Sequence, residues 1–173
     1  HGRVFGLIGM GRIGAATARR ARGFGMQIRY TNRKPVAPAL AAELGAEFVS
    51  LDELLRTADV LSVHCPLTPE THHLLNAERL AQLKPSAILI NTARGPVVDE
   101  AALADALARG ALRGAGLDVY EHEPRVHPAL MDRDDVMLLP HLGSATTETR
   151  AVMAELALAN CVAVLKAEPP TTP

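Results

Sequence analysis

The chain has 173 residues, of which 48% are hydrophobic, and this suits one ordinary globular domain with a sizeable core. Aromatic residues make up only 3% of the sequence, which argues against the base-stacking surfaces of nucleic-acid-binding proteins. The formal net charge is −1, and no apolar run reaches the roughly 20 residues that cross a membrane. We expect a cytoplasmic protein that binds neither nucleic acid nor membrane.

The charges are distributed unevenly along the chain. Residues 1–42 contain arginines and a lysine but no Asp or Glu. Such asymmetry is typical of a protein with an anionic ligand. We assign Arg33 and Lys34 to ligand binding and three other arginines to a solvated helix face: Arg19, Arg20 and Arg22.

The cysteines give no indication of a metal site. Cys65 and Cys161 are far apart in the sequence and do not form a metal-ligand pair. We expect both to be small buried hydrophobic residues in a reducing compartment, and we expect no bound metal.

In the first half of the chain, buried apolar runs alternate with helical patterns. The first run, 3–8, predicts a strand, and a glycine-rich turn follows it. The next helix, 12–24, has one apolar face composed of Ile13, Ala16, Thr17, Ala21 and Phe24. The remaining elements of this half are strands at 27–31, 46–49 and 60–64 and helices at 38–44 and 51–57, the last begun by a capping box of Ser50 and Glu53.

The second half continues the alternation. Asn76 caps a helix that ends at Lys84, because the residue before a proline resists helical torsions. Asp99 caps a helix at 100–109. Strands are expected at 87–91, 116–119 and 136–139. The pattern predicts an α/β fold with a doubly wound parallel sheet of about seven strands in three αβα layers.

The last helix, 146–166, departs from this pattern because apolar residues surround most of its circumference. These residues are Val152, Met153, Leu156, Leu158, Val162, Val164 and Leu165. A helix that is apolar all round is buried all round. We therefore expect it to be covered by a surface that this domain does not supply.

A dinucleotide-binding pattern follows the first strand. Gly9, Gly11 and Gly14 match G-x-G-x-x-G between a strand and a helix. The first glycine permits a tight turn, the second lets a pyrophosphate approach the backbone, and the third allows close packing of helix and strand. The helix amides then face the phosphates. This context predicts a Rossmann-type dinucleotide site.

The residues after the second strand indicate which dinucleotide is preferred. An acid that binds the adenosine ribose is usual here, but the sequence has Thr31, Asn32, Arg33 and Lys34. Arg33 can grip a 2′-phosphate in a bidentate fork, Lys34 adds charge, and Asn32 or Thr31 supplies a neutral donor. We predict a preference for NADP(H), with NAD(H) possible.

Three later segments combine an arginine, acids and a histidine, each at the carboxyl end of a predicted strand. They are 91–95, 117–124 and 139–145. Ligands bind at these strand ends in open α/β sheets. An arginine can hold a carboxylate, and a histidine paired with an acid can exchange a proton with a carbonyl oxygen. The set suits reduction of a 2-oxo acid. His64 is expected at the sheet end, and His72, His73, His122 and His127 are expected in loops.

Five motifs in order make the chain resemble the NAD(P)-binding domain of D-isomer-specific 2-hydroxyacid dehydrogenases, closest to the glyoxylate/hydroxypyruvate reductase branch. They are the segments 6–14, 64–68, 91–95, 116–119 together with 123–124, and 140–145.

The resemblance assigns roles to individual residues. It implies that Arg94 binds the substrate carboxylate and carbonyl, that His141 is the acid/base, and that Glu123 is the partner of His141, leaving Glu121 as a bystander. It also implies that Asp118 hydrogen-bonds the nicotinamide carboxamide. The full expected cofactor-binding set is Gly9, Gly11, Arg12, Ile13, Gly14, Thr31, Asn32, Arg33, Lys34, Cys65, Pro66, Thr92, Ala93, Asp118, His141 and Gly143.

The resemblance also implies a longer protein. Residues 1–145 match the dinucleotide-binding domain, and 146–173 match a helix and tail that return to a substrate domain absent from this chain. The whole protein is expected to be a homodimeric oxidoreductase that reduces glyoxylate, hydroxypyruvate or a similar 2-oxo acid to the D-2-hydroxy acid. We expect the 173-residue chain to bind cofactor with little or no turnover.

Two other functions use a similar domain. Dehydrogenase-like corepressors keep the arginine, glutamate and histidine and use the dinucleotide as a ligand, but an NAD-sensing protein should carry an acid where Arg33 stands. A methyltransferase domain that binds S-adenosylmethionine also has a glycine-rich turn, but it leaves Arg94, Glu123 and His141 unexplained.

Overall fold

A computed structural model describes residues 1–172. The described residues form two compact units, one covering His1–Pro140 and the other beginning at His141. The first unit contains the sheet and most of the helices, and the second contains one long helix.

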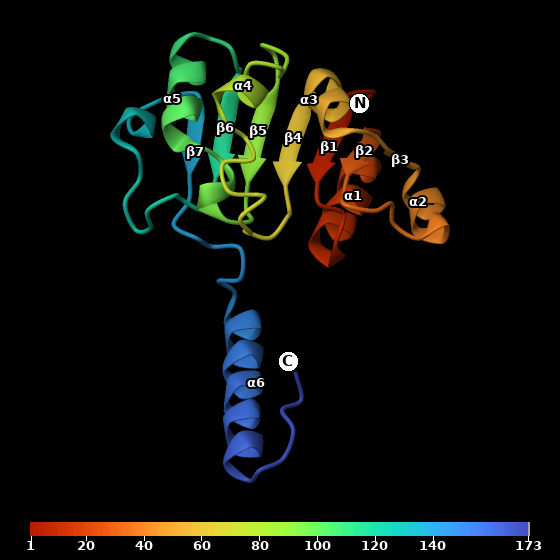
Figure 1. Cartoon of the computed structure of the whole chain (residues 1–173), viewed down its shortest axis with the longest axis vertical. Coiled ribbons are helices and arrows are strands. Elements are labelled where there is room, and N and C mark those ends of the chain that lie inside the picture. The colour runs from red at the N-terminus through yellow and green to blue at the C-terminus, as the bar shows by residue number, and fades with distance from the viewer. Residues whose placement is uncertain (173) are drawn as a thin grey trace. The chain divides into compact units, whose positions relative to one another are not determined.

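All seven strands of the first unit form one parallel sheet, in the order β3-β2-β1-β4-β5-β6-β7. The strands are β1 (Val4–Ile8), β2 (Gln27–Thr31), β3 (Ala46–Phe48), β4 (Val60–Val63), β5 (Ile88–Asn91), β6 (Gly114–Leu117) and β7 (Val136–Leu138). Their arrowheads point the same way in Figure 1. The predicted fold class is confirmed.

The helices of the first unit connect successive strands. They are α1 (Arg12–Gly23), α2 (Pro38–Leu44), α3 (Leu51–Thr57), α4 (Ala77–Leu80) and α5 (Glu100–Ala108), with single 3-10 turns at η1 (Gly95–Val97) and η2 (Pro128–Leu130). Three predicted caps are confirmed, because Ser50, Asn76 and Asp99 accept hydrogen bonds from backbone amides three residues later.

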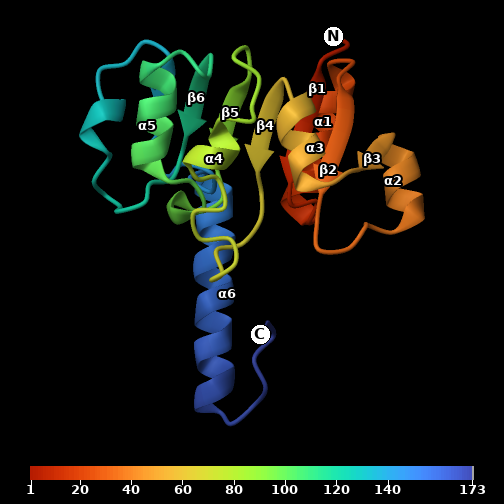
Figure 2. The same ribbon diagram turned by 45° about the horizontal axis from the view of Figure 1, so that its top comes forward.

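Helices cover both faces of the sheet. Successive side chains of β1 point to opposite faces and belong to two separate hydrophobic cores. Phe5 and Leu7 pack with the residues of α1, and Ile8 packs with those of α3, α4 and α5. Figure 2 shows α3, α4 and α5 along one side of the sheet. This is the three-layer arrangement that the alternating pattern predicts.

The apolar face predicted for α1 is wrong at its two largest residues and right at Ala21. Ile13 and Phe24 are 72% and 76% exposed, whereas Gly14, Ala15, Ala18 and Ala21 are buried. The helix lies so close to the sheet that only small residues fit on the buried face. Side-chain size therefore selected a different face from the one that hydrophobicity indicated.

Two elements have different ends from those predicted. After Leu80, hydrogen bonds from Gln82 to Arg79 and from Leu83 to Leu80 tighten the chain into turns, so α4 is four residues long and stops well before Lys84. Strand β6 begins at Gly114 and ends at Leu117, two residues earlier than expected. Asp118 is therefore a loop residue directly after the strand.

The register aligns the carboxyl ends of the strands in one row. Ile8 pairs with Val63, Val63 with Asn91, and Asn91 with Leu117. At the two sides of this row, Thr31 pairs with Ile8, and Leu138 pairs with Leu117. The next residue after each of these strand ends therefore lies at the same edge of the sheet.

The second unit contains α6 (Thr147–Leu165), which Thr146 caps. Ala163 is the only buried residue of this helix in the described part of the structure, so the first unit does not supply the covering surface that its apolar pattern calls for. Leu158 and Leu165 are 66% and 86% exposed, and Cys161, which we expected to be buried, is exposed. None of the helices in residues 1–172 has the length and apolar character of a membrane span.

Candidate functional site

The glycine turn after β1 is packed too tightly for side chains at two of its positions. Gly9 has φ of 101°, and a Cβ there would lie 2.7 Å from the backbone nitrogen of Cys65. A Cβ on Gly14 would collide with the carbonyl oxygen of Gly9. A Cβ on Gly11 would have no atom within 4 Å, so this part of the turn is open to a ligand.

The end of β2 holds the glycine turn in place. The amide of Gly9 donates to the carbonyl of Thr31 at 3.0 Å, and the amide of Met10 donates to Oδ1 of Asn32 at 2.7 Å. One side of the Asn32 amide is thus occupied in shaping the turn. Asn32 has a structural role that the sequence-based assignment to the phosphate did not include.

A cavity of about 1130 Å³ opens beside this turn, along the row of strand ends. Eight of the predicted cofactor residues line it: Gly9, Gly11, Thr31, Asn32, Arg33, Lys34, Cys65 and Pro66. The other predicted residues of the first unit do not line it: Arg12, Ile13, Gly14, Thr92, Ala93 and Asp118. His141 and Gly143 belong to the second unit.

The loop after β4 supplies pocket residues that the sequence reasoning missed, including Thr68, Glu70, Thr71 and Leu74. Thr71 fixes the loop, because its hydroxyl donates to the carbonyl of Pro66 and accepts from the amide of Thr68, both at 2.7 Å. Of the predicted cofactor residues, Cys65 and Pro66 belong to this loop.

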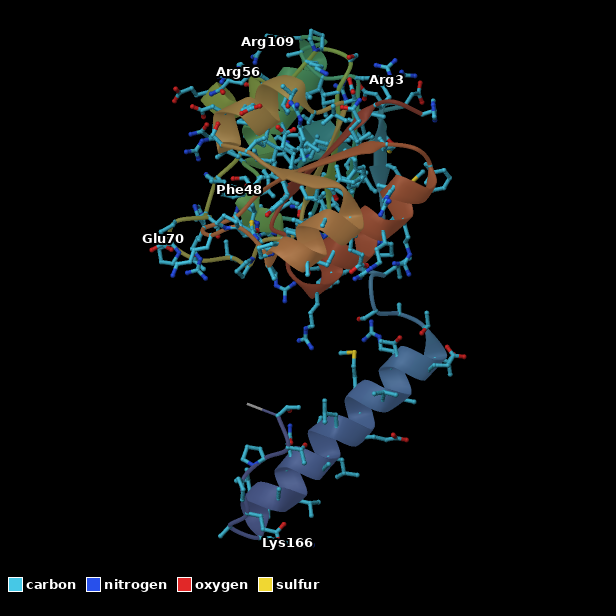
Figure 3. The ribbon with its side chains drawn as sticks, turned by 90° about the vertical axis from the view of Figure 1, so that its right-hand side faces the viewer. Arg3, Phe48, Arg56, Glu70, Arg109 and Lys166 are labelled. Carbon is cyan, nitrogen blue, oxygen red and sulfur yellow. The ribbon has the colours of Figure 1, made fainter. Side chains whose placement is uncertain are left out.

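The charges in this cavity are not all of one sign. Arg33 and Lys34 are exposed at its wall. Glu70, labelled in Figure 3, lies on the loop across from them, and a hydrogen bond with Thr68 together with the Arg33 charge lowers its pKa. Glu70 therefore adds a negative charge to a cavity wall that otherwise carries Arg33 and Lys34.

Two partly buried groups lie beneath the glycine turn. Burial lowers the pKa of His64, whose Nε2 lies 2.9 Å from the hydroxyl of Ser62, and burial raises the pKa of the Cys65 thiol. Both groups are consequently uncharged near neutral pH. His64 lies at the sheet end, as predicted.

Arg94 projects from a loop that a buried asparagine shapes. Asn91, only 1% exposed, donates from its side-chain amide to the carbonyl of Arg94 at 3.0 Å and accepts from the amide of Ala93 at 3.1 Å. The next residue, Gly95, packs against the backbone of Tyr120 so closely that a Cβ would collide with it. The exposed Arg94 side chain is thus presented beside the loop after β6.

The loop after β6 carries Glu123 and is held by a buried carboxylate. Glu100, 5% exposed, accepts from the amides of Glu121 at 2.5 Å and His127 at 3.1 Å. Glu123 is exposed and accepts from the amide of Tyr120 at 3.2 Å. Glu100 was not predicted, because its partners lie more than twenty residues away in the sequence.

Glu121, to which the resemblance assigns no catalytic role, holds two loops together in the structure. Its Oε1 lies 2.7 Å from Nε2 of His73, and its side chain is only 17% exposed. His73 is indeed a loop residue, but it is held in place. Tyr120, the preceding residue, donates from its hydroxyl to the carbonyl of Leu139 at 2.7 Å and so ties this loop to the end of β7.

The second unit begins at His141 with an unusual backbone conformation. His141 has φ of 55°, in the left-handed region that few residues other than glycine adopt. It is the third residue after the end of β7, from which Leu139 and Pro140 separate it along the chain.

A family model for the NAD-binding domain of D-isomer specific 2-hydroxyacid dehydrogenases matches residues 1–143. The glyoxylate reductase of Thermococcus onnurineus is 52% identical over 172 residues, which cover 99% of this chain and 51% of that protein. The glyoxylate reductase of Thermofilum pendens is 50% identical over 171 residues, which cover 98% of this chain and 50% of that protein.

Solved structures show the same similarity. A glyoxylate reductase from Paecilomyes thermophila is 45% identical with a TM-score of 0.89, over 94% of this chain and 49% of that one. An NADPH-dependent glyoxylate/hydroxypyruvate reductase from Sinorhizobium meliloti, solved with NADP and malonate, is 44% identical with a TM-score of 0.88, over 94% and 50% of the two chains. The chain spans about half the length of the curated relatives it matches. With its glycine turn, its row of strand ends and these similarities, the chain belongs to the D-isomer specific 2-hydroxyacid dehydrogenase family and contains the NAD-binding domain of that family.

Proposed function

We propose that this domain binds NADP(H) in preference to NAD(H) and belongs to a reductase that converts a small 2-oxo acid, such as glyoxylate or hydroxypyruvate, to the D-2-hydroxy acid. The observation that carries the coenzyme preference is the pair Arg33 and Lys34 in the wall of the cavity, at the strand end where a carboxylate would repel a 2′-phosphate. The NADPH-dependent relative supports it.

The residues present fit the cofactor. Gly11 leaves open space for a pyrophosphate, and the first turn of α1 carries no side-chain cap within the described residues, so its amides remain for an anion. Arg33 and Lys34 are the groups for the 2′-phosphate, and Cys65 and Pro66 flank the rest of the cavity. When bound, NADPH supplies the hydride for the reduction.

The chemistry at the substrate is assigned to three side chains. Arg94 holds the carboxylate of the 2-oxo acid through its planar guanidinium, which Asn91 and Gly95 position. His141 donates the proton that the carbonyl oxygen takes up as the carbonyl carbon is reduced. Glu123 keeps His141 protonated for this step, and Asp118, 4% exposed, binds the nicotinamide carboxamide.

The whole protein is proposed to be a cytoplasmic homodimer in which a substrate domain forms the second wall of the cleft. The relatives, about twice as long as this chain, and the exposed apolar residues of α6 support a further partner surface.

Calorimetric titration of the 173-residue chain with NADPH and with NADH tests the coenzyme preference. We expect NADPH to bind more tightly by about 1–3 kcal/mol, which is what a charge-assisted contact contributes. The Arg33→Gln variant should lose most of that difference while its affinity for NADH stays unchanged. Arg56→Gln is the matched control, because Arg56 is exposed on α3 and does not line the cavity.

Equal affinity for the two coenzymes would refute the preference, as would an equal loss in the two variants. If NADH binds as well as NADPH, an NAD-sensing protein becomes the better interpretation of the domain. If neither coenzyme binds, the domain does not form its site in the 173-residue chain.

A further inference from the structure

Two histidines and a carboxylate converge on one point outside the cofactor cavity. His72 and His73 lie in the segment between β4 and α4, and Glu121 lies in the loop after β6. Their ligand atoms are all within 4.8 Å of one another. The ring centroids of the two histidines are 4.2 Å apart, with 26° between the ring planes. Both segments are at the carboxyl ends of the strands, on the side toward which the arrowheads point in Figure 1.

We propose that His72, His73 and Glu121 bind a divalent transition-metal ion of the zinc type. Two imidazole nitrogens and one carboxylate oxygen suit Zn²⁺, whereas Mg²⁺ and Ca²⁺ prefer oxygen ligands alone. Three protein ligands leave a fourth position for a water molecule. None of the three residues lines the cofactor cavity, and the proposal does not rest on the proposed coenzyme preference.

Two of the proposed ligands, His73 and Glu121, are held in orientation by contacts with neighbouring groups. Ligands of structural and catalytic zinc are commonly held in this way. Nε2 of His73 faces Oε1 of Glu121 at 2.7 Å, while its Nδ1 faces Oδ2 of Asp99 at 3.8 Å. Asp99 is fixed because its Oδ1 caps α5 at the amide of Ala102, 2.9 Å away. The other oxygen of Glu121 accepts from the amide of Glu100 at 3.3 Å.

These contacts determine which ring nitrogen of His73 carries a proton when a metal is bound. A metal on Nε2 of His73 requires that nitrogen to be deprotonated, so the ring proton resides on Nδ1, facing the carboxylate of Asp99. With metal bonds of roughly 2 Å, Nε2 and Oε1 of Glu121 must move apart by roughly 0.5 Å to become tetrahedral ligands. A change of this size is within the reach of side-chain rotation.

The local charge favours a cation at this position. Asp99, Glu100 and Glu121 lie together, and within residues 1–172 no arginine or lysine forms an ion pair with any of them. Glu100 is 5% exposed and Glu121 is 17% exposed at its side chain, so water screens these carboxylates only partly. A divalent ion would offset this concentration of negative charge.

Titration of the 173-residue chain with ZnCl₂, without any nicotinamide cofactor, tests the site. We expect one tightly bound equivalent of Zn²⁺. His72→Gln, His73→Gln and Glu121→Gln should each lower the affinity about tenfold or more, and Co²⁺ should give a visible absorption band that the three variants lose. His122→Gln is the control, because His122 is exposed and adjacent in sequence to Glu121 but is not part of the cluster.

Since His73 and Glu121 also hold loops together, circular dichroism has to accompany these titrations. His72 is exposed, so its variant should fold even if the other two do not. The proposal is overturned if His72→Gln binds Zn²⁺ and Co²⁺ as the wild type does, or if His122→Gln loses as much affinity. A folded wild-type chain that binds no Zn²⁺ would also overturn it, whatever its affinity for NADPH.

Discussion

The thiol of Cys65 lies in the wall of the cofactor cavity and is largely removed from bulk water. Burial raises its pKa, so near neutral pH it carries a smaller fraction of thiolate than an ordinary cysteine does. Only the thiolate is alkylated. Its reaction rate should therefore be low near neutral pH and should rise about tenfold for each pH unit until the raised pKa is reached.

We predict that a Cys161→Ser variant, in which Cys65 is the remaining cysteine, reacts slowly with iodoacetamide and that saturating NADPH slows it further by covering the thiol. The matched variant is Cys65→Ser, which keeps the exposed Cys161 and should show no effect of NADPH. Peptide mass spectrometry over a pH series measures both rates. Equal protection of the two cysteines would contradict the assignment of Cys65 to the cavity.

At the scale of single residues, the sequence predicted roles that depend on near neighbours. Ser50, Asn76 and Asp99 cap helices through amides three residues away, and this signal is contained in the local sequence. The contact between Glu121 and His73 was not predicted, because the two residues are 48 apart in the sequence and meet only in the folded chain. No spacing rule connects two loops that leave different strands.

At the scale of elements, the contact between β1 and α1 distinguishes two glycines of the same motif. A methyl group on Gly14 meets the carbonyl of Gly9, whereas one on Gly11 meets nothing within 4 Å. Gly14→Ala should destabilise the domain by about 3 kcal/mol through overpacking and abolish NADPH binding. Gly11→Ala should change stability by no more than about 1 kcal/mol yet weaken NADPH binding, because its methyl group occupies the approach to the pyrophosphate.

Urea unfolding and calorimetry of the two variants measure these effects separately. A Gly11→Ala variant that binds NADPH as the wild type does would show that the phosphates do not pass this side of the turn. A Gly14→Ala variant of wild-type stability would show that α1 can move away from the sheet.

The sequence predicted which segments are strands and which are helices, but it did not predict which face of α1 is buried. The alternation of apolar strands with helices predicted the parallel sheet, because each βαβ unit has to bury its strand on both faces. The buried face of α1 was mispredicted because the largest apolar residues, Ile13 and Phe24, do not fit where the helix approaches the sheet. Close packing, not hydrophobicity, selects the face there.

At the scale of the whole molecule, we predict binding without efficient turnover. The 173-residue chain should bind NADPH but oxidise it with glyoxylate at close to the background rate, because its cavity is formed along a single edge of one sheet. Binding by calorimetry and NADPH absorbance with glyoxylate present are the two measurements. Rapid turnover by the purified chain would contradict this prediction and would mean that this chain completes the substrate site.

For the whole molecule too, the sequence predicts some features and leaves others open. The apolar pattern of α6 predicts a covering surface but does not say which surface it is, and in this chain those side chains are exposed. The proposed roles of Arg94, Glu123 and His141 remain predictions, since they depend on a substrate and a cofactor.

The order of the strands separates the residues proposed for the 2′-phosphate from those proposed for the nicotinamide and the substrate. Arg33 and Lys34 follow β2, whereas Arg94 and Asp118 follow β5 and β6, on the far side of β1 and β4. With roughly 4.8 Å between neighbouring strands, about 19 Å separates the end of β2 from that of β6. If the proposed roles hold, the loop that carries Arg33 and Lys34 can be exchanged to change the coenzyme preference while the loops that carry Arg94 and Asp118 stay intact.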